Sequence, residues 1–219
     1  GINVTPSENR EYSYTDKKSG YWYGRTHQDE PQEWYSGWNM AKRRVLSDYT
    51  LSVDGKNLDR ADASCVVSPD RLVRQWENAV ETFQLVDNLP IIYIEIKTEE
   101  PTSAITLDKT LIAEEYTVDG DTFYIPVEAP DKRIMVGNDG AKGFVFTYGT
   151  EDECRALYEE FLQNKDHLIK KRKDRINSLI TEYNPIQSNL PELDKALDWI
   201  TITMDELITC QQGNGIYAG

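Results

Sequence analysis

Short runs of alternating apolar and polar residues, separated by turn-forming pairs, limit the fold of this chain more than any other feature. The alternation extends from Gly20 to about Tyr148. A period of two is typical of a half-buried β-strand, because successive side chains point to opposite faces of a sheet. The pattern therefore predicts a mainly β, antiparallel domain over residues 1–149, of the sandwich or barrel type, in which the polar residues 1–19 are irregular. Strands do not alternate with helices, which excludes a Rossmann-type domain.

Three glycine-containing sequences predict hairpin turns in this domain: Asp54-Gly55, Asp119-Gly120 and Asn138-Asp139-Gly140. An Asp-Gly pair is typical of a type I′ turn, whose two central residues both take positive φ. The most apolar run, Leu89–Lys97, is expected in the middle of a sheet. Further strands are expected at Ser64–Val67, Arg71–Trp76, Val80–Val86, Glu114–Val118, Thr122–Val127, Arg133–Val136 and Phe144–Tyr148.

The pattern changes to helical spacing at Thr150. Thr150 and Glu153 have the spacing of a capping box, in which each side chain bonds the backbone of the other residue. The first helix is expected within residues 150–188 and the second within residues 189–219, opening near Asn189–Pro191. The apolar residues of the second helix recur every three or four positions, at Leu193, Leu197, Ile200, Met204 and Leu207.

The net charge of −14 argues against nucleic acid and anionic membranes as partners, since both require a basic surface. No run approaches the roughly 20 apolar residues of a membrane span. The three cysteines lie far apart, so we expect small buried side chains, with no metal site and no cofactor. The polar start at Gly1, without Met, favours an extracytoplasmic location, periplasmic or secreted, and leaves a cytoplasmic one open.

Aromatic residues concentrate between Gly20 and Trp38, where the rings could stack on the flat faces of a saccharide. Spacing provides no partner for a histidine acting as a general base and no carboxylate pair for glycoside hydrolysis, so no catalytic residue is predicted. The alternative is that the rings pack between two sheets. The candidate saccharide-binding residues are Trp22, Tyr23, Arg25, His27, Trp34 and Trp38.

Two groups of segments resemble a known family. The first resembles the first helix of the (α/α)₆ catalytic barrel in amylo-α-1,6-glucosidases and glycogen-debranching-like enzymes, of the six-hairpin glycosidase clan. It comprises Ala196-Leu197-Asp198-Trp199, Met204-Asp205-Glu206-Leu207-Ile208 and Gly213-Asn214-Gly215-Ile216-Tyr217-Ala218-Gly219. The second resembles the N-terminal β-supersandwich of that clan. It comprises Tyr23-Gly24-Arg25-Thr26-His27, Gly37-Trp38, Asp48-Tyr49-Thr50-Leu51 with Asp54-Gly55, and Pro69-Asp70-Arg71-Leu72-Val73-Arg74.

The resemblance implies the non-catalytic N-terminal portion of a glycoside hydrolase that acts on α-glucosides. Residues 150–188 would be a linker helix, and residues 189–219 the first helix of a truncated barrel. The catalytic carboxylates would then lie beyond Gly219, and the partners would be the chain's own C-terminal helical barrel and an α-glucan or oligosaccharide.

Two other functions stay open. A stand-alone carbohydrate-binding β-sandwich would need Trp22, Trp34 or Trp38 exposed and coplanar. A ligand-free interaction module would instead have buried tryptophans and a large apolar patch around Leu193–Leu207.

Overall fold

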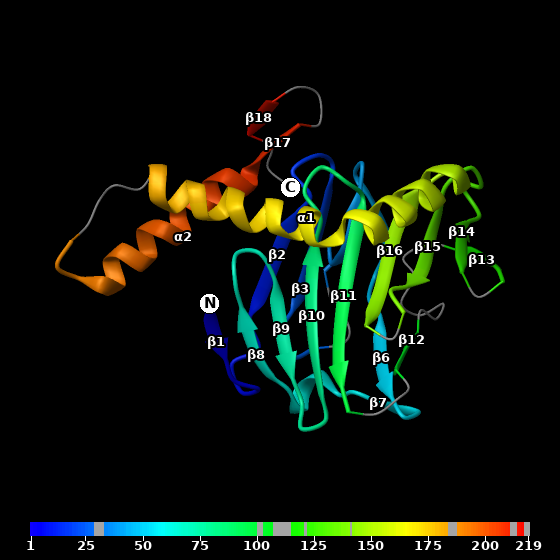
Figure 1. The fold of residues 1–219 in the computed structure, drawn as a ribbon, viewed down its shortest axis with the longest axis horizontal. Coiled ribbons are helices and arrows are strands. Elements are labelled where there is room, and N and C mark those ends of the chain that lie inside the picture. Colours follow the sequence, from blue (N-terminus) through cyan, green and yellow to red (C-terminus); the bar gives the residue numbers. More distant parts are fainter. Residues whose placement is uncertain are drawn as a thin grey trace.

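Antiparallel sheets followed by two long helices make up the computed structural model (Figure 1). The structure describes residues 1–28, 33–99, 103–106, 115–120, 122–140, 142–183, 188–210 and 214–216. Within these residues the mainly β architecture and the two helices that follow it are confirmed, and no sheet closes into a barrel. No described helix is long and apolar enough to cross a membrane.

The largest sheet has nine strands, and smaller sheets accompany it. Its order is β1 (Ile2–Val4), β8 (Ser64–Val67), β9 (Leu72–Gln75), β10 (Ala79–Leu85), β11 (Ile91–Thr98), β16 (Gly143–Gly149), β15 (Arg133–Asn138), β14 (Phe123–Pro126) and β13 (Tyr116–Asp119). The four-stranded sheet has the order β2 (Glu11–Thr15), β3 (Gly20–Arg25), β4 (Gly37–Met40) and β5 (Arg43–Leu46). The three-stranded sheet has the order β12 (Ser103–Thr106), β6 (Thr50–Val53) and β7 (Lys56–Asn57), and a short 3₁₀ helix covers Arg60–Asp62.

The apolar run expected in the middle of a sheet forms β11, the central strand of the nine, which confirms that prediction. Ile92 and Ile94 face the core shared with the four-stranded and three-stranded sheets. Ile91 and Tyr93 face the opposite side, where Phe161 of α1 (Glu151–Tyr183) packs on them. The run is apolar at nearly every position because protein covers both faces of this strand.

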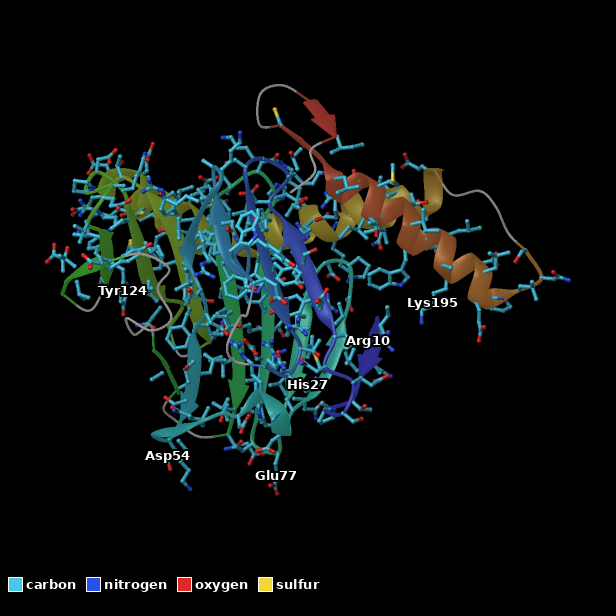
Figure 2. The ribbon with its side chains drawn as sticks, turned by 180° about the vertical axis from the view of Figure 1, so that it is seen from behind. Arg10, His27, Asp54, Glu77, Tyr124 and Lys195 are labelled. Atoms are coloured by element: carbon cyan, nitrogen blue, oxygen red, sulfur yellow. The ribbon has the colours of Figure 1, made fainter. Side chains whose placement is uncertain are left out.

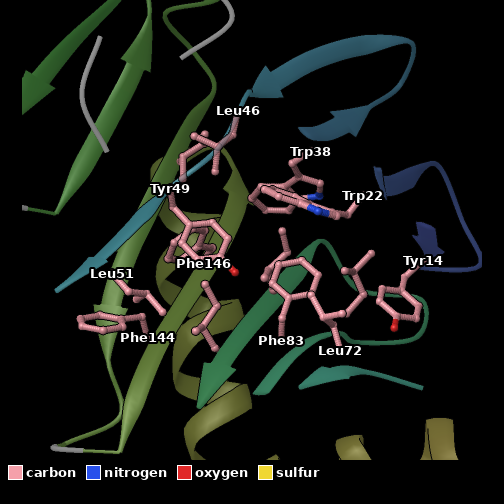
Figure 3. Close-up of a cluster of buried hydrophobic side chains, with 14 of the residues drawn as sticks. Tyr14, Trp22, Trp38, Leu46, Tyr49, Leu51, Leu72, Phe83, Phe144 and Phe146 are labelled. Atoms are coloured by element: carbon pink, nitrogen blue, oxygen red, sulfur yellow. The ribbon is translucent and has the colours of Figure 1, made fainter. Parts of the chain in front are cut away.

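The core between the sheets is rich in aromatic rings (Figure 3). Phe83 of β10 lies at its centre, with ring centroids 5.0 Å from Trp22 and 6.1 Å from Tyr49. The same core contains a buried charge pair, in which Arg74 on β9 lies directly opposite Glu81 on β10 at 3.0 Å. Because the surrounding core is apolar, the Arg74–Glu81 pair is stable only when the remaining donors and acceptors of both side chains are hydrogen-bonded.

The other N–H groups of Arg74 donate to backbone carbonyls at the end of β3, in the four-stranded sheet. Its Nε donates to the Thr26 carbonyl at 2.9 Å, and a terminal nitrogen donates to the Arg25 carbonyl at 3.1 Å. Glu81 accepts a further bond from the Tyr49 hydroxyl. These bonds join two layers of the molecule and fix how the sheets lie on each other.

The hairpin turns agree with the sequence. Asp54 and Gly55 have φ of 49° and 71°, so the β6–β7 turn has the positive φ pair of a type I′ turn. Gly120 and Gly140 also have positive φ, in the turns after β13 and β15. All three predicted hairpins are confirmed.

The helices begin where the sequence indicates. The Glu153 amide donates to Thr150 Oγ1 at 3.3 Å, and the Thr150 amide donates to Glu153 Oε2 at 2.8 Å, which confirms the capping box before α1. α2 covers Pro191–Leu207, with proline at its first position, and β17 (Ile208–Cys210) pairs with β18 (Asn214–Ile216) after it.

Some expectations were wrong. Residues 1–19 hold β1 and β2 rather than irregular chain, because Tyr12 and Tyr14 give β2 a buried face within a polar sequence. Cys65 and Cys154 are buried as expected, whereas Cys210 is exposed. Three predicted features lie partly outside the described residues: Glu114 at the start of an expected strand, Pro185 at the expected end of the first helix, and Gly213 with residues 217–219 of the C-terminal glycine motif.

Candidate functional site

The structure separates the predicted site residues between the two faces of a hairpin. Trp22 and Trp38 are paired across β3 and β4 and point into the core, with 2% and 1% of their surfaces exposed. The Trp22 indole N–H donates to the Tyr12 hydroxyl at 3.1 Å. These two rings therefore follow the alternative in which the aromatic residues pack between two sheets, because this part of the chain forms strands and the rings complete the core.

His27 is also a structural residue in this arrangement, and only 6% of it is exposed. Its Nε2 lies 3.1 Å from the Ala63 carbonyl, which can only accept, so this nitrogen carries the proton. Its Nδ1 lies 2.8 Å from Thr26 Oγ1. Burial lowers the pKa of His27, which keeps the ring neutral. Figure 2 shows His27 among the strands, away from the outward-pointing Lys195 of α2.

Arg25 lies at the end of β3 and is engaged in ion pairs. Its guanidinium lies 2.7 Å from Glu33 and 3.4 Å from Glu11. The guanidinium thus ties the segment after β3 to the neighbouring strand, next to the aromatic residues described below.

The outward face of β2 and β3 forms the floor of a cleft of about 300 Å³. Ser13 lies opposite Tyr23, and Thr15 lies opposite Tyr21, so these four side chains share one face. The intervening residues of the same strands, Tyr12, Tyr14 and Trp22, point into the core. The alternation of the two strands thus produces a core face and a cleft face.

Trp34 and Tyr35 extend this floor into an aromatic wall. The Tyr23 and Tyr35 rings meet edge to face at 4.9 Å, and the Tyr35 and Trp34 rings do so at 5.4 Å. Trp34 is 77% exposed, although aromatic residues of this size are mostly buried in folded proteins. Of the predicted site residues, Tyr23 and Trp34 are thus the two that line the cleft.

The opposite wall comes from the C-terminal end of α2 and from β17, far away in sequence. Glu206, Leu207 and Thr209 line this side. The Thr209 hydroxyl is buried and has no hydrogen-bond partner among the described residues. A buried hydroxyl without a partner costs free energy, so this group is one that a bound molecule could satisfy.

Glu206 is held in place from the sheet. Its carboxylate accepts from the Thr15 amide at 3.0 Å and from Thr15 Oγ1 at 2.9 Å. Burial alone would raise the pKa of Glu206, but the charges of Arg172 and Arg175 outweigh it and leave the pKa below its usual value. Glu206 is therefore an acceptor and not a proton donor.

The described lining of the cleft supplies aromatic and polar groups that can bind a ligand. Glycosidases need two carboxyl groups across the scissile bond, one of them protonated. Glu206 is the one carboxylate among the described lining residues, and it is ionised. The described residues contain no cluster of three or more His, Cys, Asp or Glu side chains suited to a metal ion.

α2 itself lies with its apolar stripe outward. Leu193, Ile200, Met204 and Leu207 are exposed, whereas Ile202, on the opposite side of the helix, is buried. Surface helices normally turn the apolar stripe inward. Here the inward side instead carries Asp205 and Glu206. A polar helix residue such as Asp205 is expected from sequence on the solvated face, and this expectation is wrong, because Asp205 pairs with Lys17 and Arg175.

Sequence reasoning missed most of the cleft. Tyr21 and Tyr35 belong to the aromatic concentration, and the alternation of β3 places Tyr21 on the face opposite to Trp22. Glu206 and Thr209 carry no local signal, because they reach the cleft only through the path of α2.

Comparison with known proteins adds no assignment. No family model matches the chain, and no curated protein is found to be its relative. The likeness to debranching-type hydrolases therefore rests on the quoted segments alone.

Proposed function

We propose that this chain is a non-catalytic saccharide-binding β-domain, the N-terminal portion of a glycoside hydrolase acting on α-glucosides. The observation that carries the proposal is the aromatic wall of the cleft, formed by Tyr21, Tyr23, Trp34 and Tyr35. Under this proposal, the sheets correspond to the β-supersandwich of the six-hairpin glycosidase clan, α1 to its linker helix and α2 to the first helix of its barrel.

A saccharide suits this cleft because its pyranose faces are apolar and its edges carry hydroxyl groups. The rings offer apolar faces, as in other pockets in which a few polar groups fix orientation. Ser13, Thr15 and Thr209 offer hydroxyl groups, Lys18 offers donors, and Glu206 offers a charged acceptor. A neutral ligand also avoids repulsion by the net charge of −14.

The test of this proposal uses two assays on one preparation. Release of glucose from α-1,4-linked and α-1,6-linked oligosaccharides measures turnover, and quenching of tryptophan fluorescence by the same sugars measures binding. We expect no glucose release and a saturable quench that is lost in Trp34→Ala. Trp76→Phe is the matched control, because Trp76 lies outside the cleft lining and bonds the Asp59 carbonyl at 2.6 Å.

Two results would contradict the proposal. Glucose release by this chain would mean that it contains a catalytic carboxylate pair. A quench that persists unchanged in Trp34→Ala would place any sugar site away from the cleft.

The outward stripe of α2 favours a second function, docking of another folded unit. Leu193, Ile200, Met204 and Leu207 form an exposed apolar surface on a helix that belongs to no larger bundle within the described residues. We propose the helical catalytic domain of the same hydrolase as its partner, in line with the resemblance. Both functions are compatible, because the stripe and the cleft share only Leu207.

The docking function is tested in the full-length protein with Ile200→Asp combined with Met204→Asp. If the stripe packs on a catalytic domain, these charges lower glucosidase activity and the unfolding temperature of the whole protein. Lys195→Asp is the matched control on an exposed, polar position of the same helix. Equal activity and stability of the double variant and the control would rule out docking at this face.

A further inference from the structure

The cleft is built from two parts of the chain that are held together mainly by charge. Its floor belongs to β2 and β3, and its second wall belongs to the end of α2 and β17. Ile202 is the one described residue of α2 that is fully buried. A helix with so little buried apolar surface belongs to the less stable parts of a fold, so the second wall is held mainly by polar contacts.

The contacts at the end of α2 reach the turn after β2. Lys17 Nζ lies 3.1 Å from Asp205 Oδ2, and the Cys210 amide donates to the Lys17 carbonyl at 3.2 Å. The Glu206 carboxylate bonds Thr15 as described above. These contacts place Glu206, Leu207 and Thr209 along the cleft.

Two arginines of α1 connect this end of α2 to Asp87, in the turn between β10 and β11, and to Thr15 of β2. Arg175 donates from Nε to Asp87 at 2.7 Å and from a terminal nitrogen to Glu206 at 2.9 Å, and it also pairs with Asp205. Arg172 donates to Asp87 at 2.6 Å and to the Thr15 carbonyl at 2.8 Å. Arg175 itself does not line the cleft, so it acts on the cleft only by positioning the second wall.

We infer that Arg175 is a positioning residue for the saccharide site, and that a saccharide in the cleft and the docked end of α2 stabilise each other. This inference rests on the proposed function and adds that the docking of α2 regulates saccharide binding in the cleft. A ligand that touches both walls binds fully only when α2 is docked, and by linkage its binding holds α2 in place. The unpartnered Thr209 hydroxyl gives such a ligand a bond on the α2 side.

Maltotriose titrations by calorimetry on the purified chain test this inference. Arg175→Met removes the contacts to Asp87, Asp205 and Glu206 while keeping an apolar stem, and we expect affinity for maltotriose to fall about tenfold, within the usual range of coupling between sites. Arg175→Lys keeps the charge and restores most of the affinity. Lys170→Met is the matched control, since Lys170 makes an exposed pair with Asp174 on the same helix and leaves affinity unchanged.

Hydrogen exchange on the wild-type chain gives a second measurement that does not depend on the folding of a variant. Saturating maltotriose should slow exchange of backbone amides in residues 199–210 and leave those of residues 151–160 unchanged. Maltotriose binding without slower exchange in residues 199–210, or with equal affinity in Arg175→Met, would overturn the inference and leave the proposed function standing. Absence of binding to the wild-type chain would overturn both.

Discussion

The two faces of β3 differ in what they contribute to the protein. On the inner face Trp22 is buried against Phe83 and its indole N–H is bonded, so this face stabilises the fold. On the outer face Tyr21 and Tyr23 are half-buried and continue into the exposed Trp34. Neighbouring aromatic residues in one short strand thus serve different purposes, and composition alone cannot separate them. The alternation of the strand does so.

The largest expected difference between the two faces of β3 is in how much a substitution lowers the free energy of unfolding. Trp22→Ala should lower the free energy of unfolding by about 3–5 kcal/mol, because it leaves a cavity and removes the indole N–H that donates to the Tyr12 hydroxyl. Trp34→Ala should change it by less than about 0.5 kcal/mol, as is usual for exposed positions. Urea unfolding followed by circular dichroism measures both. Similar losses for the two variants would contradict the assignment of the faces.

The buried charge pair beneath the inner face gives a second test. Arg74→Met leaves the buried Glu81 carboxyl without its charge partner and should cost about 3–5 kcal/mol of unfolding free energy. The double variant Arg74→Met, Glu81→Met removes both charges and should regain a large part of that loss. A double variant no more stable than the single one would show that the bonds to the Thr26 and Arg25 carbonyls matter more than the charges.

A third test concerns how the free energy of unfolding depends on pH through Asp16, the buried residue that directly follows β2. Burial raises the pKa of Asp16 from 3.8 to about 6, despite hydrogen bonds from the Lys18 and Gly20 amides and the charges of Lys18 and Arg172. Between these values the folded chain keeps a proton that the unfolded chain has lost. The free energy of unfolding therefore falls as pH rises from about 4 to 6, by up to about 1.4 kcal/mol per pH unit.

Asp16→Asn should remove this contribution, because its side-chain carbonyl keeps accepting from both amides without titrating. Urea unfolding of the wild type and the variant at several pH values between 4 and 7 measures the difference. Parallel curves for the two proteins would mean that Asp16 titrates with an ordinary pKa.

The smallest effect is expected on the outer face itself. Tyr35→Ala removes a ring that meets both Tyr23 and Trp34 edge to face and that aligns the aromatic wall of the cleft. We expect the affinity for maltotriose to fall several-fold, with little change in unfolding free energy. Calorimetric titration of the variant provides the measurement, and an unchanged affinity would remove Tyr35 from the site.

Local sequence patterns predicted the strands and turns well, because period and turn chemistry act over a few residues. Ser64–Val67 coincides with β8, and the Asp54-Gly55 turn has the expected positive φ pair. The run at Leu89–Lys97 marked the central strand. β2 was missed because its polar neighbours hide the alternation of Tyr12 and Tyr14.

The site was less predictable because it depends on contacts between distant segments. Trp22 and Trp38 carry the same local signal as Trp34, and only the pairing of β3 with β4 shows that they point inward. The outward stripe of α2 appeared in the sequence analysis only under the interaction-module alternative. Sequence could not select it, since the ion pairs of Arg175 with Asp205 and Glu206 decide which side of the helix faces the sheet.

The most direct test of the account observes all five tryptophans at once. Each indole N–H gives its own signal in a ¹H–¹⁵N NMR spectrum, and single Trp→Phe variants assign them. On titration with maltotriose, the account predicts that the Trp34 signal shifts in a saturable manner while the Trp22 and Trp38 signals stay in place. No shift of the Trp34 signal, or larger shifts of Trp22 and Trp38, would contradict the claim that the outer face of this hairpin binds saccharide.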